Sequence, residues 1–201
     1  MEKQRIAVLA SGAGSNAEAI LRYFEGSAWA DVVWVGCNRP ETHAGVYTRT
    51  RALGLETTPF QASELWSGAV LDMLCSTGVD WVILAGFLLR IPEAMVGHFK
   101  GRMVNIHPAL LPNFGGKGMY GMHVHQAVKA AGCTESGMTV HWVTSAYDEG
   151  DVIFQASCTL EPEDEPEQIA QKVAQLEHRY YARAIDALIQ DAAAQTSLQH
   201  G

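Results

Sequence analysis

Short apolar segments alternate with longer amphipathic segments over the first half of the chain. The apolar segments are nearly continuous, which is typical of strands buried on both faces of a parallel sheet. We predict strands at 5–10, 32–36, 80–85 and 103–106. The intervening segments are long enough for crossover helices, which we place at 16–25, 41–53 and 63–77.

The pattern changes after about residue 136. The apolar segments 137–143 and 151–160 are separated only by the turn-rich sequence TSAYDEG. Two strands joined by so short a loop are predicted to be neighbours in the sheet. Unlike the earlier strands, they have no helix between them, so we expect the last strands to be partly antiparallel.

A final helix is predicted after the acidic sequence EPEDEPE. Its apolar positions recur at steps of four, three and four, at Ile169, Val173, Leu176 and Tyr180. We expect the tail, about 191–201, to fray. The predicted fold class is therefore α/β, a Rossmann-like and mostly parallel sheet flanked by helices on both faces, in a single domain spanning 1–201.

Composition narrows the function classes. The 201 residues are 48% hydrophobic and carry a formal net charge of -8, without a basic cluster. We therefore expect no nucleic-acid partner, although backbone amides could still hold a small anion. The four cysteines lack CxxC spacing, and no segment approaches about 20 consecutive apolar residues, so we expect a cytoplasmic protein with free thiols and no membrane partner.

The segment SGAGSN, residues 11–16, directly follows the first predicted strand and opens a predicted helix. Free N–H groups at a helix start favour an anion, and glycines let a ligand approach the backbone closely. The alternative is purely structural: Gly12 and Gly14 would only form a tight turn, with Ser15 or Asn16 capping the helix.

In the segment VNIHPALLP, residues 104–112, Asn105 and His107 are two positions apart at the end of a predicted strand. They should share one face at the carboxyl edge of the sheet, where ligands bind in open α/β folds. An amide beside an imidazole suits a reaction that develops negative charge on a carbonyl oxygen. Alternatively, both side chains satisfy backbone groups at the strand end.

Asp148 lies in the turn-like YDEGD between the last two predicted strands. If it faces His107, its carboxylate would raise the imidazole pKa and fix the ring. A metal site built from His107, His123, His125 and Asp148 is a weaker alternative, because MHVHQAVKAAG reads as a helix that separates the two histidines. Glu177, on the last helix, carries no functional prediction by itself.

Taken in order, SGAGSN, LAGFLLRIP, NIHPALLP, HVHQAV, GMTVHWV, YDEGDVIFQ and LEH resemble the phosphoribosylglycinamide formyltransferases, folate-dependent enzymes of purine synthesis. The resemblance extends from Ile6 to about Ile189. It implies transfer of a formyl group from 10-formyltetrahydrofolate, the co-substrate, to the amine of 5'-phosphoribosylglycinamide, without a metal. It also implies small-molecule ligands and a monomer or homodimer.

The resemblance also implies roles for individual residues. Asn105, His107 and Asp148 match the family's catalytic residues. The residues matching its substrate site are Gly14, Ser15, Asn16 and Glu177. The formyl-folate would contact Leu88, Leu89, Arg90, Ile91, Asn105, Thr144, Tyr147 and Asp148.

Three other functions remain open from the sequence. A formyltetrahydrofolate hydrolase would use the same catalytic residues with water as acceptor. A nucleotide-binding module without catalysis would use the glycine segment alone, with Asn105 and His107 structural. A metal hydrolase would use the four-residue metal set named above.

Overall fold

The computed structural model describes residues 2–199, with side chains as far as residue 195. The strands in this part of the chain are β1 (Gln4–Ala10), β2 (Ala30–Cys37), β3 (Thr57–Pro59), β4 (Trp81–Leu84), β5 (Met103–His107), β6 (Glu135–Trp142) and β7 (Val152–Thr159). The helices are α1 (Ser15–Phe24), α2 (Val46–Arg51), α3 (Ala62–Ser67), α4 (Ala69–Ser76), α5 (Glu93–His98), α6 (Met122–Ala130) and α7 (Pro166–Gln199), with a 3-10 turn η1 (Glu41–His43).

The strands form one sheet in the order β3-β2-β1-β4-β5-β6-β7. Pairing is parallel from β3 to β5, and antiparallel from β5 to β6 and from β6 to β7. The winding direction reverses between β1 and β4, which opens a crevice at the carboxyl ends of these strands. The predicted fold class, including the antiparallel last strands, is confirmed.

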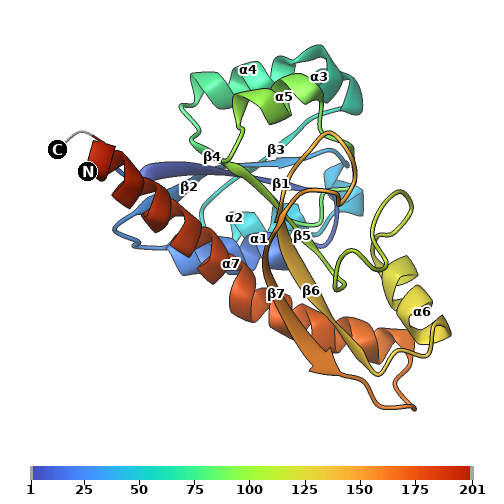
Figure 1. The fold of residues 1–201 in the computed structure, drawn as a ribbon. Helices are drawn as coiled ribbons and strands as arrows, with labels where there is room; N and C mark the ends of the chain where they lie inside the picture. The colour runs from blue at the N-terminus through green and yellow to red at the C-terminus, as the bar shows by residue number, and fades with distance from the viewer. Residues whose placement is uncertain (1, 200–201) are drawn as a thin grey trace.

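Helices cover the two faces of the sheet, as Figure 1 shows, with α3, α4 and α5 on one side and α1, α2 and α7 on the other. Alternate residues of β1 supply both cores. Ile6 and Val8 pack in the cluster that includes α1 and α7, whereas Ala7 and Leu9 pack in the cluster that includes α3, α4 and α5. Burial on both faces explains why the strand sequences are continuously apolar.

Several boundaries differ from the sequence predictions. The helix expected at 63–77 is divided into α3 and α4 at Gly68, whose φ of +93° is left-handed and interrupts the helical hydrogen bonding. The helix expected at 41–53 is likewise the turn η1 followed by α2. The short strand β3 and the helix α5 were not predicted, because each is too short to show a period.

The helix α7 continues through the segment expected to fray. Residues 191–199 are helical, because this Ala- and Gln-rich segment favours helix and Ala192 packs against the core. Positions 200 and 201 of that prediction lie outside the described residues. No helix in the described part of the chain is long and apolar enough to cross a membrane.

A buried tyrosine fixes α7 against the sheet. The Tyr181 hydroxyl donates to the Leu84 carbonyl at 2.9 Å and lies 3.4 Å from the Val104 carbonyl. Glu177 is one turn earlier on α7 and so projects from the same face of the helix. This anchor directs Glu177 toward the carboxyl ends of β4 and β5.

Candidate functional site

A pocket of about 820 Å³ lies at the carboxyl ends of β1, β4 and β5. Its walls come from the segments after these strands, the loop between β6 and β7, and the helices α6 and α7. This is the crevice created by the reversal of strand order between β1 and β4. The volume is near the upper end of the range for ligand pockets, about 300–1,000 Å³.

The glycine segment forms one wall of the pocket through Ala13, Ser15 and Asn16. Gly14 does not line the pocket. It precedes α1 with a φ of +77°, and a Cβ there would lie 2.5 Å from the Cα of Val46. Neither Ser15 nor Asn16 caps the helix, because no side-chain hydrogen bond closes its start. The capping alternative is therefore wrong, and both side chains line the pocket instead.

Residues of α2 donate hydrogen bonds to the glycine segment. The Val46 amide donates to the Gly12 carbonyl at 3.3 Å, and the Arg49 guanidinium donates to the Ala13 carbonyl at 3.0 Å. These bonds occupy the Gly12 and Ala13 carbonyls. The amides at the start of α1 remain the groups that an anion would meet.

Asn16 and Glu177 meet inside the pocket, although they are far apart in the sequence. Asn16 Nδ2 donates to Glu177 Oε2 at 2.9 Å, whereas Asn16 Oδ1 is buried without a partner among the described residues. Burial raises the pKa of Glu177, and the bond from Asn16 opposes this effect. Unsatisfied oxygens of this kind suit a ligand rich in N–H or O–H donors.

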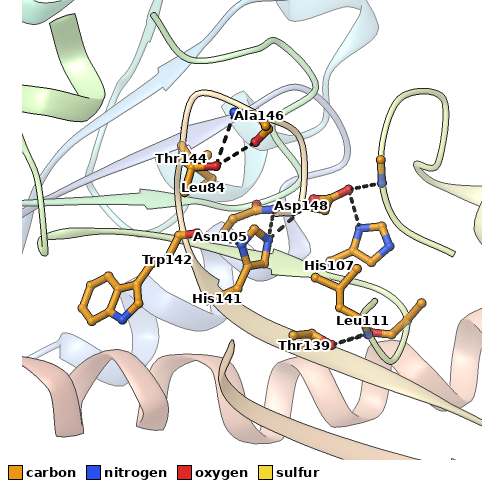
Figure 2. A network of polar contacts seen from close by, with 12 residues as sticks. Leu84, Asn105, His107, Leu111, Thr139, His141, Trp142, Thr144, Ala146 and Asp148 are labelled. Atoms are coloured by element: carbon orange, nitrogen blue, oxygen red, sulfur yellow. Dashed lines mark hydrogen bonds and ion pairs between the residues drawn. The ribbon is translucent and has the colours of Figure 1, made fainter. Parts of the chain in front are cut away.

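Asn105, His107 and Asp148 come together on another wall, as Figure 2 shows. His107 Nδ1 lies 3.4 Å from Asp148 Oδ2, and Asn105 Nδ2 lies 3.5 Å from Asp148 Oδ1. Asp148 has a φ of +56° and accepts a 3.0 Å bond from the Gly116 amide. A non-glycine residue in this region is uncommon and is often found at functional sites.

The electrostatics of the His107–Asp148 pair differ from the sequence expectation in one respect. Burial lowers the pKa of His107, and outweighs the opposing effects of Asp148 and the Phe114 carbonyl. The contribution of Asp148 has the expected sign, but burial of the ring sets the net direction. For Asp148, burial would raise the pKa, but His141, His107 and the Gly116 amide together lower it. Asp148 therefore carries a negative charge at neutral pH.

The sequence reading missed His141, which is buried on β6 directly opposite Asn105. His141 Nε2 lies 3.0 Å from Asn105 Nδ2 and 3.5 Å from Asp148 Oδ1. Part of this placement could be read from the sequence, because Thr139 and His141 are two residues apart in a predicted strand and therefore lie on the same face. The register that pairs this face with Asn105 could not be read from the sequence.

Buried polar groups hold the chain segment after His107 against the neighbouring strands. Thr139 donates to the Ala109 carbonyl at 2.6 Å and accepts from the Leu111 amide at 3.0 Å. Gln155 adds a 2.9 Å bond to the Leu111 carbonyl. These hydrogen bonds fix the direction in which the chain leaves His107.

The residues predicted to contact a folate also line the pocket: Leu88, Leu89, Arg90, Ile91, Thr144 and Tyr147. The Leu88 amide donates to Ser11 Oγ at 3.0 Å, and Arg90 donates to the Ser145 carbonyl at 2.6 Å. Arg90 thus joins the loop after β4 to the loop after β6. Together these loops form a largely apolar wall with few polar groups.

The two histidines of the metal alternative behave differently. His125, on α6, is buried in the pocket wall with Nδ1 unpartnered among the described residues, whereas His123 stacks on Tyr120. Burial lowers the pKa of His125, and the nearby His107 adds to this effect. Over residues 2–199, no group of three or more His, Cys, Asp or Glu side chains is arranged to hold a metal ion.

Comparison with known proteins agrees with the resemblance seen in the sequence. A formyl transferase family model matches residues 4–185. The chloroplastic phosphoribosylglycinamide formyltransferase of Arabidopsis thaliana is 37% identical over 94% of this chain, and that of Bacillus subtilis is 31% identical over 92%. The match spans 66% of the Arabidopsis protein and 95% of the Bacillus protein.

Solved structures give the same assignment. The crystal structure of phosphoribosylglycinamide formyltransferase from Anaplasma phagocytophilum has a TM-score of 0.85 and 31% identity, covering 94% of this chain and 89% of that one. Glycinamide ribonucleotide transformylase 1 from Symbiobacterium toebii has a TM-score of 0.84 and 32% identity, with the same coverage. The chain belongs to the formyl transferase family.

Proposed function

We propose that this protein transfers the formyl group of 10-formyltetrahydrofolate to the amine of 5'-phosphoribosylglycinamide, in purine biosynthesis. The observation that carries the proposal is the composition of one pocket. The glycine segment with Glu177, the Asn105–His107–Asp148 cluster and the apolar wall at 88–91 all line it. A bisubstrate reaction needs these three features to be within reach of one another.

The acceptor substrate fits the wall formed by the glycine segment and α7. Its phosphate would bind the amides at the start of α1, supported by Ser15 and Asn16, where a negative charge is stabilised. Glu177 and the free Asn16 oxygen would accept hydrogen bonds from ribose hydroxyls or from the glycinamide end. The phosphate therefore needs no cationic side chain in this arrangement.

The folate fits the largely apolar wall formed by the loops after β4 and β6. Its ring system would lie along the loop after β4, against Leu88, Leu89 and Ile91, with Thr144 and Tyr147 on the facing loop. Backbone groups of these loops would supply the few directional hydrogen bonds that a planar heterocycle requires. The formyl group would then reach Asn105 and Asp148.

The chemistry follows from the charges that develop. The unprotonated amine forms a bond to the formyl carbon, and the carbonyl electrons move to its oxygen to give a tetrahedral intermediate. Asn105 stabilises this oxyanion by donating from its amide. The attacking nitrogen loses a proton, and the folate nitrogen gains one as its bond to carbon breaks. His107 acts in its protonated form: it donates a proton from Nε2 to the folate nitrogen and takes up the proton that the attacking nitrogen loses. Asp148 balances the charge of the imidazolium.

One contact must change before His107 can act. Its Nε2 lies 2.8 Å from the Phe114 carbonyl, so this nitrogen carries a hydrogen that points at the protein backbone. We propose that the reacting ligand, or a water next to it, takes the place of this carbonyl. His107 would then present Nε2–H to the reacting centre while Nδ1 faces Asp148.

The test is the absorbance change that accompanies deformylation of 10-formyltetrahydrofolate, measured with and without 5'-phosphoribosylglycinamide. We expect fast deformylation only when the amine substrate is present. Equal rates under both conditions would mean a formyltetrahydrofolate hydrolase. An absence of reaction with either, together with nucleotide binding, would mean a binding module in which Asn105 and His107 are structural.

A further inference from the structure

His141 contacts the side chain that we propose as the oxyanion donor, and the mechanism above gives His141 no role. Its ring is buried on β6, and two of its contacts are short enough to define its protonation; a third, from Nε2 to Asp148 Oδ1, is longer, at 3.5 Å. Nδ1 lies 2.9 Å from the Trp142 carbonyl, and Nε2 lies 3.0 Å from Asn105 Nδ2. Both contacts are within hydrogen-bonding distance.

The Trp142 carbonyl determines which nitrogen carries the hydrogen. A carbonyl only accepts, so His141 Nδ1 must be the donor in this contact. A neutral imidazole has one N–H, and Nε2 therefore holds the lone pair. The group facing this lone pair must be a donor, which the Asn105 NH2 is.

This contact decides how the Asn105 amide is oriented. The two ends of an amide have nearly the same shape, so their partners alone fix which end faces the reacting centre. The end near His141 is also the end near Asp148 Oδ1, at 3.5 Å. One hydrogen of the NH2 is held by His141. The contact of the other with Asp148 is too long for a strong hydrogen bond, which leaves that hydrogen available to a ligand.

We infer that His141 is a positioning residue, which holds the Asn105 amide with its NH2 toward the formyl oxygen. The inference rests on the proposed function of Asn105. Without the lone pair of His141, the amide could rotate and present its carbonyl, which would repel the oxyanion. Because Asp148 also favours the NH2 orientation, removing His141 should reduce turnover only partly, by about tenfold.

A double-mutant cycle separates positioning from a general structural role. We expect His141→Leu to lower kcat about tenfold in the wild-type background, with the KM for both substrates nearly unchanged. In the Asn105→Ala background, the same substitution should change kcat less than about twofold, because the group it positions is gone. His141→Gln keeps an acceptor near the position of Nε2 and should recover part of the activity. His43→Gln, at an exposed histidine, serves as the control.

The outcomes are distinct. Equal losses from His141→Leu in both backgrounds would overturn the inference while leaving the proposed function intact. If Asn105→Ala itself retains nearly full turnover, the role of Asn105 fails and the inference falls with it. A second measurement needs no variant: nitrogen-15 NMR of the histidines should show neutral His141 with its hydrogen on Nδ1. A hydrogen on Nε2 would overturn the inference.

Discussion

The glycine segment and the cluster around Asp148 line the same pocket but are built differently. In residues 11–16 the groups that we propose to meet the ligand are backbone amides and the side chains of Ser15 and Asn16, which are consecutive in the chain. Around Asp148 the groups are side chains from β5, β6 and the following loop. Asn105 and Asp148 are separated by 43 positions in the sequence.

This difference determines how each region should respond to substitutions. A backbone site depends on conformation, so a substitution there should disturb the turn and its neighbour α2 before it changes any chemistry. The side-chain cluster depends on which atoms donate and accept. Substitutions there should change turnover while leaving the fold and the binding of substrates nearly intact.

The largest expected effect is at Asn105. A single oxyanion donor is worth about 3 kcal/mol, so Asn105→Ala should lower kcat roughly a hundredfold or more. The thermal midpoint and both KM values should change little, because the side chain is at a strand end. Steady-state kinetics with purified protein is the measurement, with Asn113→Ala as the control, since Asn113 is exposed and outside the pocket. Turnover within a few-fold of wild type would contradict the assignment.

The next effect, at Gly14, should act through the fold. Gly14→Ala combines a φ of +77° with a Cβ placed 2.5 Å from the Val46 Cα. Strain and overpacking together should lower the free energy of unfolding by about 2–4 kcal/mol, measured by urea denaturation. Gly12 is the matched control, because a Cβ there meets nothing within 4 Å.

Gly12→Ala should change the free energy of unfolding by less than about 1 kcal/mol. The KM for the phosphate-bearing substrate should rise in Gly14→Ala, since the turn that presents the amides must shift. An equal loss of stability in Gly12→Ala and Gly14→Ala would contradict this explanation. The positive φ and the contact with Val46 would then not be the reason why position 14 requires glycine.

The same contrast explains what could be predicted from the sequence. The glycine segment, the strand before it and the position of Asn105 and His107 at a strand end follow from local patterns. The 3.4 Å contact between His107 and Asp148, and the position of His141 opposite Asn105, depend on strand register and on a loop with a positive φ. The resemblance to a family identified Asp148, but no periodicity in the sequence identifies the register that places His141.

Burial was the second limit of the sequence reading. The Asp148 carboxylate raises the pKa of His107 as expected, but burial of the ring has the larger effect and lowers this pKa overall. Glu177 carried no functional prediction of its own, because acidic residues on a helix surface are usually solvated. Its burial follows from the Tyr181 anchor one turn later, which ties α7 to the strand ends.

The smallest expected effect concerns Glu177, where the two kinds of region meet. Burial raises the pKa of this carboxyl above its ordinary value of 4.5, so the folded state binds a proton that the unfolded state releases. The stability of the protein therefore falls as the pH rises from about 4.5 through the folded pKa. Glu177→Gln removes this dependence and keeps an oxygen for Asn16 Nδ2.

We therefore expect Glu177→Gln to unfold at a higher temperature than wild type at pH 8, and at the same temperature near pH 4, where both side chains are neutral. Glu167→Gln, at an exposed position in the first turn of α7, should show no such pH-dependent gain. The KM for the acceptor substrate should rise in Glu177→Gln, because a charged acceptor of its hydrogen bonds becomes neutral. A stability gain without a change in KM would mean that Glu177 is buried for structural reasons, and that the acceptor wall of the pocket consists of the glycine segment alone.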